Sequence, residues 1–198
     1  TAGVREFQKR FSILELEAFF NDLVCRYLDW AETVADWYGI RNASLKGLAF
    51  PFDVYRPGQR EMAVDVYRTI RQGEQLLVRA ATGIGKTMAV IYPSAKALSE
   101  GLTSKIFYLT ARTTGKTVAE KALADLRLKG ARIKSLTITA KEKICFDTAN
   151  ACTAEECDYA KGYYDRINGA LTDVFRLEAY DRETLIRASK EHRVCPFA

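Results

Sequence analysis

The chain has 198 residues, 48% of them hydrophobic and 28% charged, a composition typical of a globular protein with enough apolar side chains to form a core. No apolar run approaches the roughly 18–20 residues needed to cross a bilayer, and no signal-peptide pattern begins the sequence, so we expect a cytoplasmic protein with no membrane partner. The formal net charge of +5 permits a polyanionic partner without requiring one, because basic and acidic residues are interspersed.

Residues 11–38 are predicted to form a helix. Ser12 and Glu15 have the spacing of a capping box, and apolar side chains then recur at helical spacing. These side chains are Leu16, Phe19, Phe20, Leu23, Val24, Tyr27, Leu28, Trp30, Val34 and Trp37. Such a stripe is typical of a core or a docking face, and we interpret Cys25 beside it as a small buried thiol.

An irregular stretch that contains Pro51 follows this helix, and it places a boundary near residue 48. Pro57 suits the first turn of a second helix, which is expected to end at Gly73. A short apolar run at 76–78 comes next and is predicted to be a buried strand.

The loop after that run has the chemistry of a phosphate cradle. Glycines let backbone N–H groups turn inward, and the helix that begins at Lys86 adds the positive end of its dipole. Lys86 can reach the terminal phosphates of ATP, and the Thr87 hydroxyl can hold Mg²⁺. The usual motif has glycine where this chain has Ala80. The predicted nucleotide-binding residues are Thr82, Gly83, Ile84, Gly85, Lys86 and Thr87; the alternative is a glycine-rich turn with a solvated lysine.

Strand and helix patterns continue to alternate after the loop. The helix that follows is expected to run to Gly101, kinked or shortened at Pro93. A second buried strand (105–110), a helix (114–129) and a third strand (133–139) come next. This alternation indicates right-handed crossovers and a parallel sheet, so the predicted fold class is α/β with a nucleotide-binding layout.

Residues 110–117 form a second loop that ends in Gly-Lys-Thr. It has one glycine where the first loop has two, and bulky side chains stand where phosphate would approach, so we place the nucleotide at Lys86. Because neighbouring parallel strands end at one edge of a sheet, the second loop could hold another phosphate, such as a nucleic-acid backbone. A capped helix start with solvated basic residues is an equally good interpretation.

Four cysteines follow the alternating region, at Cys145, Cys152, Cys157 and Cys195. In a cytosolic protein such a group is more typical of a metal site than of disulfides. Cys152 and Cys157 meet the loose end of the pair spacing in structural zinc sites, and His192 is close enough in sequence to join one. Four thiolates also suit an iron–sulfur cluster, although the spacing is not that of ferredoxins. A cluster, a zinc site and free structural cysteines all remain open at this point.

In combination, these motifs resemble the iron–sulfur helicases of the XPD/DinG type within superfamily 2. Residues 55–59 are similar to the nucleotide-reading segment of that family, and residues 81–87 to its phosphate loop. Residues 108–113 resemble the motif that touches the DNA backbone, and residues 139–145 the segment that leads into the first cluster cysteine. The resemblance extends over residues 55–198.

The resemblance implies an ATP-dependent DNA helicase that couples ATP hydrolysis to translocation on single-stranded DNA and to the unwinding of fork DNA. It implies that Gln59 reads the adenine edge, with Arg56 or Tyr55 packed near the base. Lys86 and Thr87 would be the catalytic residues, which hold the phosphates and Mg²⁺. The alternative for Gln59 is an exposed residue in the first turn of a helix.

The same resemblance assigns roles to residues after the second strand. Thr110, Arg112 and Lys141 would lie along single-stranded DNA, although Lys141 could equally be one of several solvated charges. The four cysteines, Cys145, Cys152, Cys157 and Cys195, would ligate a [4Fe–4S] cluster in a domain that acts as a structural wedge.

The implied architecture has three parts. Residues 1–48 would form an N-terminal helical segment. Residues 49–140 would form part of a RecA-like motor domain with a parallel P-loop sheet and flanking helices. Residues 141–198 would form a mostly α-helical iron–sulfur domain. An acidic Walker B segment, a second RecA-like domain and its arginines are expected in such a helicase, and none is visible in the sequence. In the family the acidic motif follows the cluster insertion, so we expect the amino-terminal part of a helicase, able to bind nucleotide weakly but unable to hydrolyse ATP efficiently or unwind DNA alone. The start at Thr1 without methionine also suggests a processed or excised fragment.

Two other functions use fewer of these features. A P-loop nucleotide-binding or switch domain with a zinc-stabilised interaction module is the main alternative, and metal identity would distinguish it. A small-molecule P-loop kinase could use Arg112 near its phosphates, but it would leave the Gln59 segment and the cysteines without a role. The helicase hypothesis is favoured because it uses all four segments.

Overall fold

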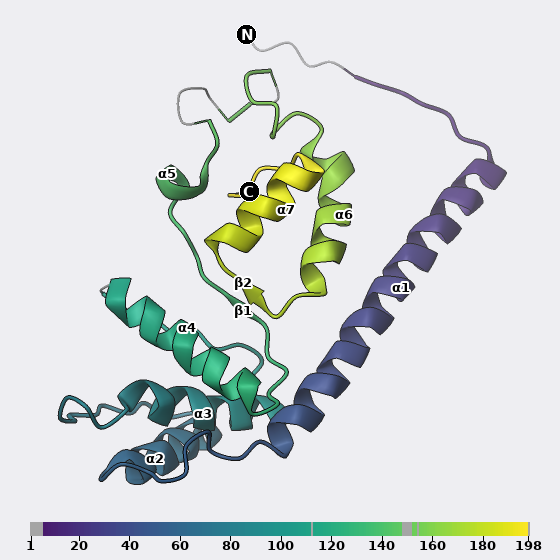
Figure 1. The fold of residues 1–198 in the computed structure, drawn as a ribbon. Helices are drawn as coiled ribbons and strands as arrows, with labels where there is room; N and C mark the ends of the chain where they lie inside the picture. Colours follow the sequence, from purple (N-terminus) through teal and green to yellow (C-terminus); the bar gives the residue numbers. More distant parts are fainter. Residues whose placement is uncertain (1–5, 112, 148–151, 154, 198) are drawn as a thin grey trace.

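The computed structural model describes residues 6–111, 113–147, 152–153 and 155–197 (Figure 1). The helices are α1 (Ile13–Lys46), α2 (Gln59–Gln72), α3 (Lys86–Ser99), α4 (Thr113–Leu128), α5 (Lys141–Ile144), α6 (Tyr163–Phe175) and α7 (Arg182–His192). Strands β1 (Ser135–Leu136) and β2 (Ala179–Tyr180) pair in parallel, with Ser135 opposite Ala179. Within these ranges, no helix is both long and apolar enough to cross a membrane.

The predicted α/β fold with a RecA-like parallel sheet is wrong, because the described chain is mostly helical. The segments 76–78 and 105–110 form no strand, and the expected strand 133–139 is reduced to β1. A parallel strand needs neighbours that pair its N–H and C=O groups and helices that cover both faces. Leu77 and Leu109 have neither here and lie exposed to solvent.

The helix predictions fared better than the strand predictions. Helices α2, α3 and α4 lie where expected, and α2 ends at Gly73, whose φ of 69° only glycine adopts easily. The first helix continues past the predicted end at Gly39 and stops at Gly47. Helix α3 continues through Pro93, which is buried, so the helix is not shortened there. The helical character predicted for both ends of the chain agrees with α1 and with α5–α7.

The core lies where α3 packs against the end of α1 and against α4. Its buried side chains include Leu45, Met88, Ile91, Leu98, Leu126 and Ile133. Lys96 of α3 also donates hydrogen bonds to the carbonyl oxygens of Leu45 (3.0 Å) and Lys46 (2.8 Å) at the end of α1. Apolar packing and this cap together fix α3 relative to α1.

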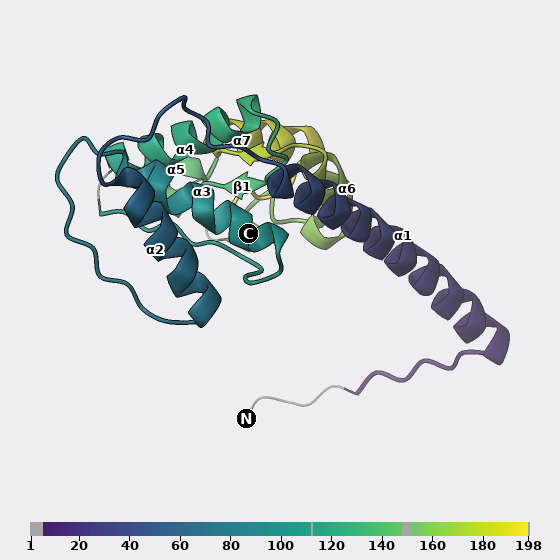
Figure 2. The ribbon, with the colours of Figure 1, turned by 90° about the horizontal axis from the view of Figure 1, so that it is seen from below.

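The first half of α1 extends away from the rest of the molecule, as both ribbon views show (Figures 1 and 2). Its large apolar side chains, Leu16, Phe19, Phe20, Leu23, Tyr27 and Leu28 among them, are exposed. The prediction that Cys25 is buried is wrong, since this part of the described chain packs against no other element. Contact begins at Trp30, whose ring meets the edge of the Phe175 ring at a centroid distance of 4.9 Å.

Arg127 joins α4 to the C-terminal elements. Its guanidinium donates to the carbonyl oxygens of Ile133 (3.1 and 2.9 Å) and Glu178 (2.8 Å), and to Ser135 Oγ (2.7 Å). Burial lowers the pKa of Arg127, and the nearby Glu178 carboxylate opposes that shift. These bonds hold β1 beside the segment that leads into β2.

Replacing Arg127 by Met should destabilise the chain by about 2–3 kcal/mol, because several carbonyl groups lose a charged donor in a partly buried place. Urea unfolding followed by circular dichroism measures this free energy. Lys129→Met, at an exposed position just after α4, is the matched control and should have little effect. Equal stability of the two variants would contradict the role given to Arg127.

Candidate nucleotide site and cysteine region

The loop that precedes α3 has the backbone conformation that its glycines permit. Gly83 and Gly85 have φ values of 85° and 79°, in the left-handed region that other residues rarely adopt. Helix α3 begins directly afterwards, and its first hydrogen bond runs from the Ala89 N–H to the Gly85 carbonyl (3.1 Å). The loop residues Ala81 to Gly83 are exposed. An anion could therefore approach the N-terminus of α3 from solvent.

Lys86 folds back over this loop. Its ammonium group donates to the carbonyl oxygens of Ala80 (3.2 Å) and Ala81 (2.6 Å), and it is exposed. A phosphate group could take the place of these carbonyl oxygens, since it is the stronger acceptor for an ammonium group. Thus Lys86 lies over the loop, at the place where the sequence predicts phosphate.

Gln59 connects α2 to the phosphate loop. It is only 2% exposed, so the alternative of a solvated helix residue is wrong. Its Oε1 accepts from the Arg56 N–H (3.0 Å), and its Nε2 donates to the Gly85 carbonyl (3.1 Å). The Arg56 guanidinium donates to the Gly83 carbonyl. Two of the predicted base-reading residues therefore bind the loop itself.

A cavity of about 380 Å³ lies beside these residues. Gln59, Gly85 and Thr87 line it at the phosphate loop, and Phe52 and Val54 line it on the chain before α2. Tyr55, which was expected near the base, is not among the lining residues. Its ring stacks on Phe50 at a centroid distance of 3.8 Å. Sequence reasoning missed Phe52 and Val54, because nothing local distinguishes them from other apolar residues.

The Thr87 hydroxyl lies 3.3 Å from the Tyr108 hydroxyl. Tyr108 belongs to the segment 105–110, which was predicted as a strand but has no regular structure. The contact brings Thr87 close to the segment that precedes the second loop. The predicted reason for such closeness, a shared edge of a parallel sheet, is absent from the described residues.

The second Gly-Lys-Thr sequence has a different geometry from the first. Helix α4 already begins at Thr113, so Gly115 and Lys116 lie within its first turn, and Lys116 pairs with Glu120 (3.9 Å). A Cβ at Gly115 would lie 2.0 Å from Thr110 Oγ1, so the Thr110 side chain covers the helix there. This geometry leaves less room for phosphate than the loop before α3. Arg112, the other predicted DNA contact in this segment, lies outside the described residues.

All five cysteines of the chain are free thiols. The Cys145 thiol donates to the Asp147 carbonyl (3.1 Å). A hydrogen bond with Cys152 raises the pKa of Lys141, and electrostatic interactions with Cys152, Cys145 and Cys195 add to this effect. Three of the four predicted ligands therefore lie near one exposed ammonium group.

The cysteines that the structure describes are not arranged as a metal site. Nowhere in the described ranges are three His, Cys, Asp or Glu side chains close enough to hold one ion. His192 pairs with Asp173 (2.9 Å), and this pair joins α7 to α6. Cys157 lies in the turn before α6, where its N–H donates to the Thr153 carbonyl (3.0 Å). The thiols suit an iron–sulfur cluster in donor type.

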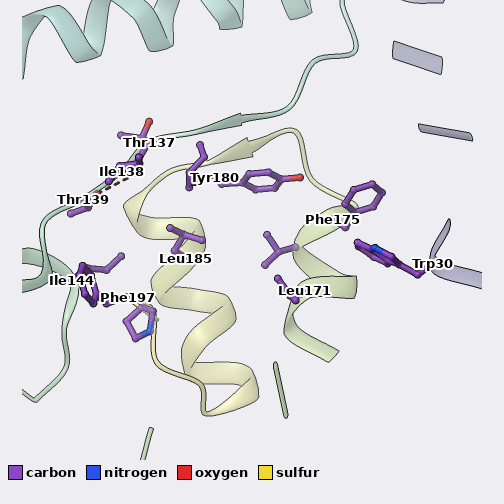
Figure 3. Close-up of a pocket in the computed structure, with 13 residues that line it drawn as sticks. Trp30, Thr137, Ile138, Thr139, Ile144, Leu171, Phe175, Tyr180, Leu185 and Phe197 are labelled. Carbon is purple, nitrogen blue, oxygen red and sulfur yellow. Dashed lines mark hydrogen bonds between the residues drawn. The ribbon is translucent and has the colours of Figure 1, made fainter. Parts of the chain in front are cut away.

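A second cavity, of about 440 Å³, lies between the 136–144 segment and helices α6 and α7 (Figure 3). Its walls are mainly apolar: Leu171 and Phe175 come from α6, Leu185 from α7, and Ile138 and Ile144 from the opposite side. The lining residues described there carry no formal charge, so this cavity is poorly suited to phosphate.

No protein-family model, curated protein or solved structure matches the chain. Functional inference therefore depends on the loop before α3, its neighbours and the sequence motifs.

Gly85→Ala should lower the free energy of unfolding by about 1–3 kcal/mol, because the new Cβ requires a strained backbone. It would also lie 2.2 Å from Gln59 Nε2. Gly39→Ala is the control, since nothing lies within 4 Å of its new Cβ and α1 should gain stability.

Combining Gly85→Ala with Gln59→Ala separates the steric clash with the Gln59 side chain from the backbone strain. Gly85→Ala should cost less in that background, and urea unfolding of the four variants gives the coupling energy. An identical cost in both backgrounds would contradict the contact between Gln59 and the loop.

Proposed function

We propose that the chain is the nucleotide-binding part of an ATP-dependent DNA helicase, which uses ATP hydrolysis to move along single-stranded DNA and unwind duplex at a fork. The observation that supports this most is the loop before α3: two glycines with positive φ, a helix N-terminus and a lysine folded over the loop. In this proposal the loop N–H groups and Lys86 bind the phosphates of ATP, and the Thr87 hydroxyl binds Mg²⁺.

Gln59 has a double role in this proposal. Its amide holds the Gly85 carbonyl, so the conformation of the loop is coupled to the start of α2. Each amide nitrogen has two protons and each amide oxygen two lone pairs, so one donor and one acceptor site remain for the edge of adenine. Arg56, bonded to Gly83, supplies positive charge beside the same loop.

The proposed DNA partner is single-stranded and contacts the chain through Thr110, Arg112 and Lys141. Lys141 is well suited to bind a phosphate because its ammonium group is exposed at the start of α5. Lys141 interacts with Cys152, so the proposed DNA contact would lie next to the cysteine region. DNA and cluster would therefore be neighbours.

In the proposed helicase, Cys145, Cys152, Cys157 and Cys195 hold a [4Fe–4S] cluster. The cluster would supply four strong covalent anchors to a region with little core of its own, and no redox step is required. Gly162 and Arg193 allow the turns that bring Cys157 and Cys195 towards α6, since both adopt positive φ.

Efficient ATP hydrolysis needs groups beyond this loop, including a carboxylate that positions the attacking water and arginines that stabilise the transferring phosphoryl group. We propose that the rest of a helicase chain, with a second motor domain, supplies them. The 198-residue chain alone should bind Mg·ATP but turn it over very slowly.

Isothermal titration of Mg·ATP tests the nucleotide site. Lys86→Ala should weaken binding by about 2 kcal/mol or more, because a charge-assisted bond to phosphate is lost. Lys116→Ala, in the second Gly-Lys-Thr sequence, is the matched control and should bind as the wild type does. If Lys116→Ala alone lost binding, the nucleotide would have to bind at the second loop instead. Absence of Mg·ATP binding by the wild type would refute the proposal.

Metal and sulfide analysis of chain purified without oxygen tests the cysteine assignment. We expect about four irons and four sulfides per chain, both lost in Cys152→Ser. Cys25→Ser is the control, because Cys25 lies on the exposed part of α1 and should not affect the metal content. One zinc without sulfide would instead support a zinc-stabilised interaction module.

A further inference from the structure

The cavity of about 380 Å³ beside the phosphate loop is also lined by residues that belong to none of the sequence motifs. One wall is a face of α4, where Val118 and Ala122 line the cavity one helical turn apart. Phe52 and Val54 line the cavity from the chain before α2. Apolar side chains from two elements far apart in sequence thus line a space that Thr87 also lines.

Polar groups are present at the same wall of the cavity. Lys121 and Asp125 of α4 also line it, and they pair with each other at 3.3 Å. A purely apolar occupant would leave these groups unused, whereas a ring with flat faces and a polar edge would use both kinds of surface. Gln59 offers a further donor and acceptor on the other side.

The size and position of the cavity narrow the choice of occupant. At about 380 Å³ it lies within the usual range of about 300–1,000 Å³ for small-molecule sites. Thr87 and Gly85 form its boundary with the phosphate loop, so a ligand whose phosphates lie at Lys86 would direct its other end into the cavity. Bases and ribose are the parts of a nucleotide that have this combination of flat apolar faces and polar edges.

We propose that α4 forms the second wall of the nucleoside pocket, with the base held between Phe52 and Val118 and with Asp125 and Lys121 at its polar edge. This inference rests on the proposed nucleotide site at Lys86 and adds specificity-determining residues on α4. The second loop and its helix then contribute to nucleotide selection as well as to the proposed DNA contact.

The test compares Mg·ATP with inorganic triphosphate and Mg²⁺, which share the phosphates but not the nucleoside. Val118 is 51% exposed, so Val118→Trp can fill the cavity without overpacking the core. It should weaken ATP binding at least about tenfold while triphosphate binding stays unchanged, because only the nucleoside loses its space. Phe52→Ala, on the opposite wall, should show the same selectivity.

Ala124→Trp is the matched control, because Ala124 is exposed on α4 and does not line the cavity. It should leave both affinities unchanged. Unchanged ATP binding in Val118→Trp and Phe52→Ala would overturn the pocket while leaving the Lys86 site intact, and so would an equal loss of ATP and triphosphate. Failure of the wild type to bind either ligand would instead overturn the proposed function on which the pocket rests.

Discussion

The packing of α3 against the end of α1 and against α4 is the constraint on which the candidate site depends. Leu45, Met88 and Leu126 are almost completely buried at this junction, and Lys96 caps the last turn of α1. The loop before α3 has no regular structure of its own, so its position follows from the helix that it precedes. Burial of these apolar side chains, at roughly 25 cal/mol per Å² of area removed from water, therefore supports the loop as well as the core.

The loop is also held from the other side. Gln59 and Arg56 bind the carbonyl groups of Gly85 and Gly83, and the Gly85 carbonyl also accepts the first hydrogen bond of α3. In the proposed site, the N–H groups of the loop would bind the phosphates. The proposed site needs three segments that are distant in sequence. The 52–59 segment would contact the base, the loop would bind the phosphates, and α4 would form the opposite wall of the pocket.

Sequence reasoning succeeded where the signals are local. Glycines at 73 and 85 correctly predict where α2 ends and α3 begins, and the helix over 114–129 differs from α4 by one residue at each end. It failed where the outcome depends on distant partners. The apolar runs 76–78 and 105–110 cannot form a sheet without neighbours, and Cys25 is exposed because none of the described elements packs over that half of α1. Phe52 and Val118 carry no local signal, since they come to line one cavity only when α4 packs against α3.

Hydrogen exchange of backbone amides, with and without saturating Mg·ATP, tests the central claim most directly, because it locates the phosphates by the N–H groups that bind them. The account predicts slower exchange at residues 82–87, where the loop N–H groups and the first turn of α3 would bind phosphate. Protection confined to residues 110–117, or no protection in either loop, would contradict the claim that the loop before α3 binds nucleotide.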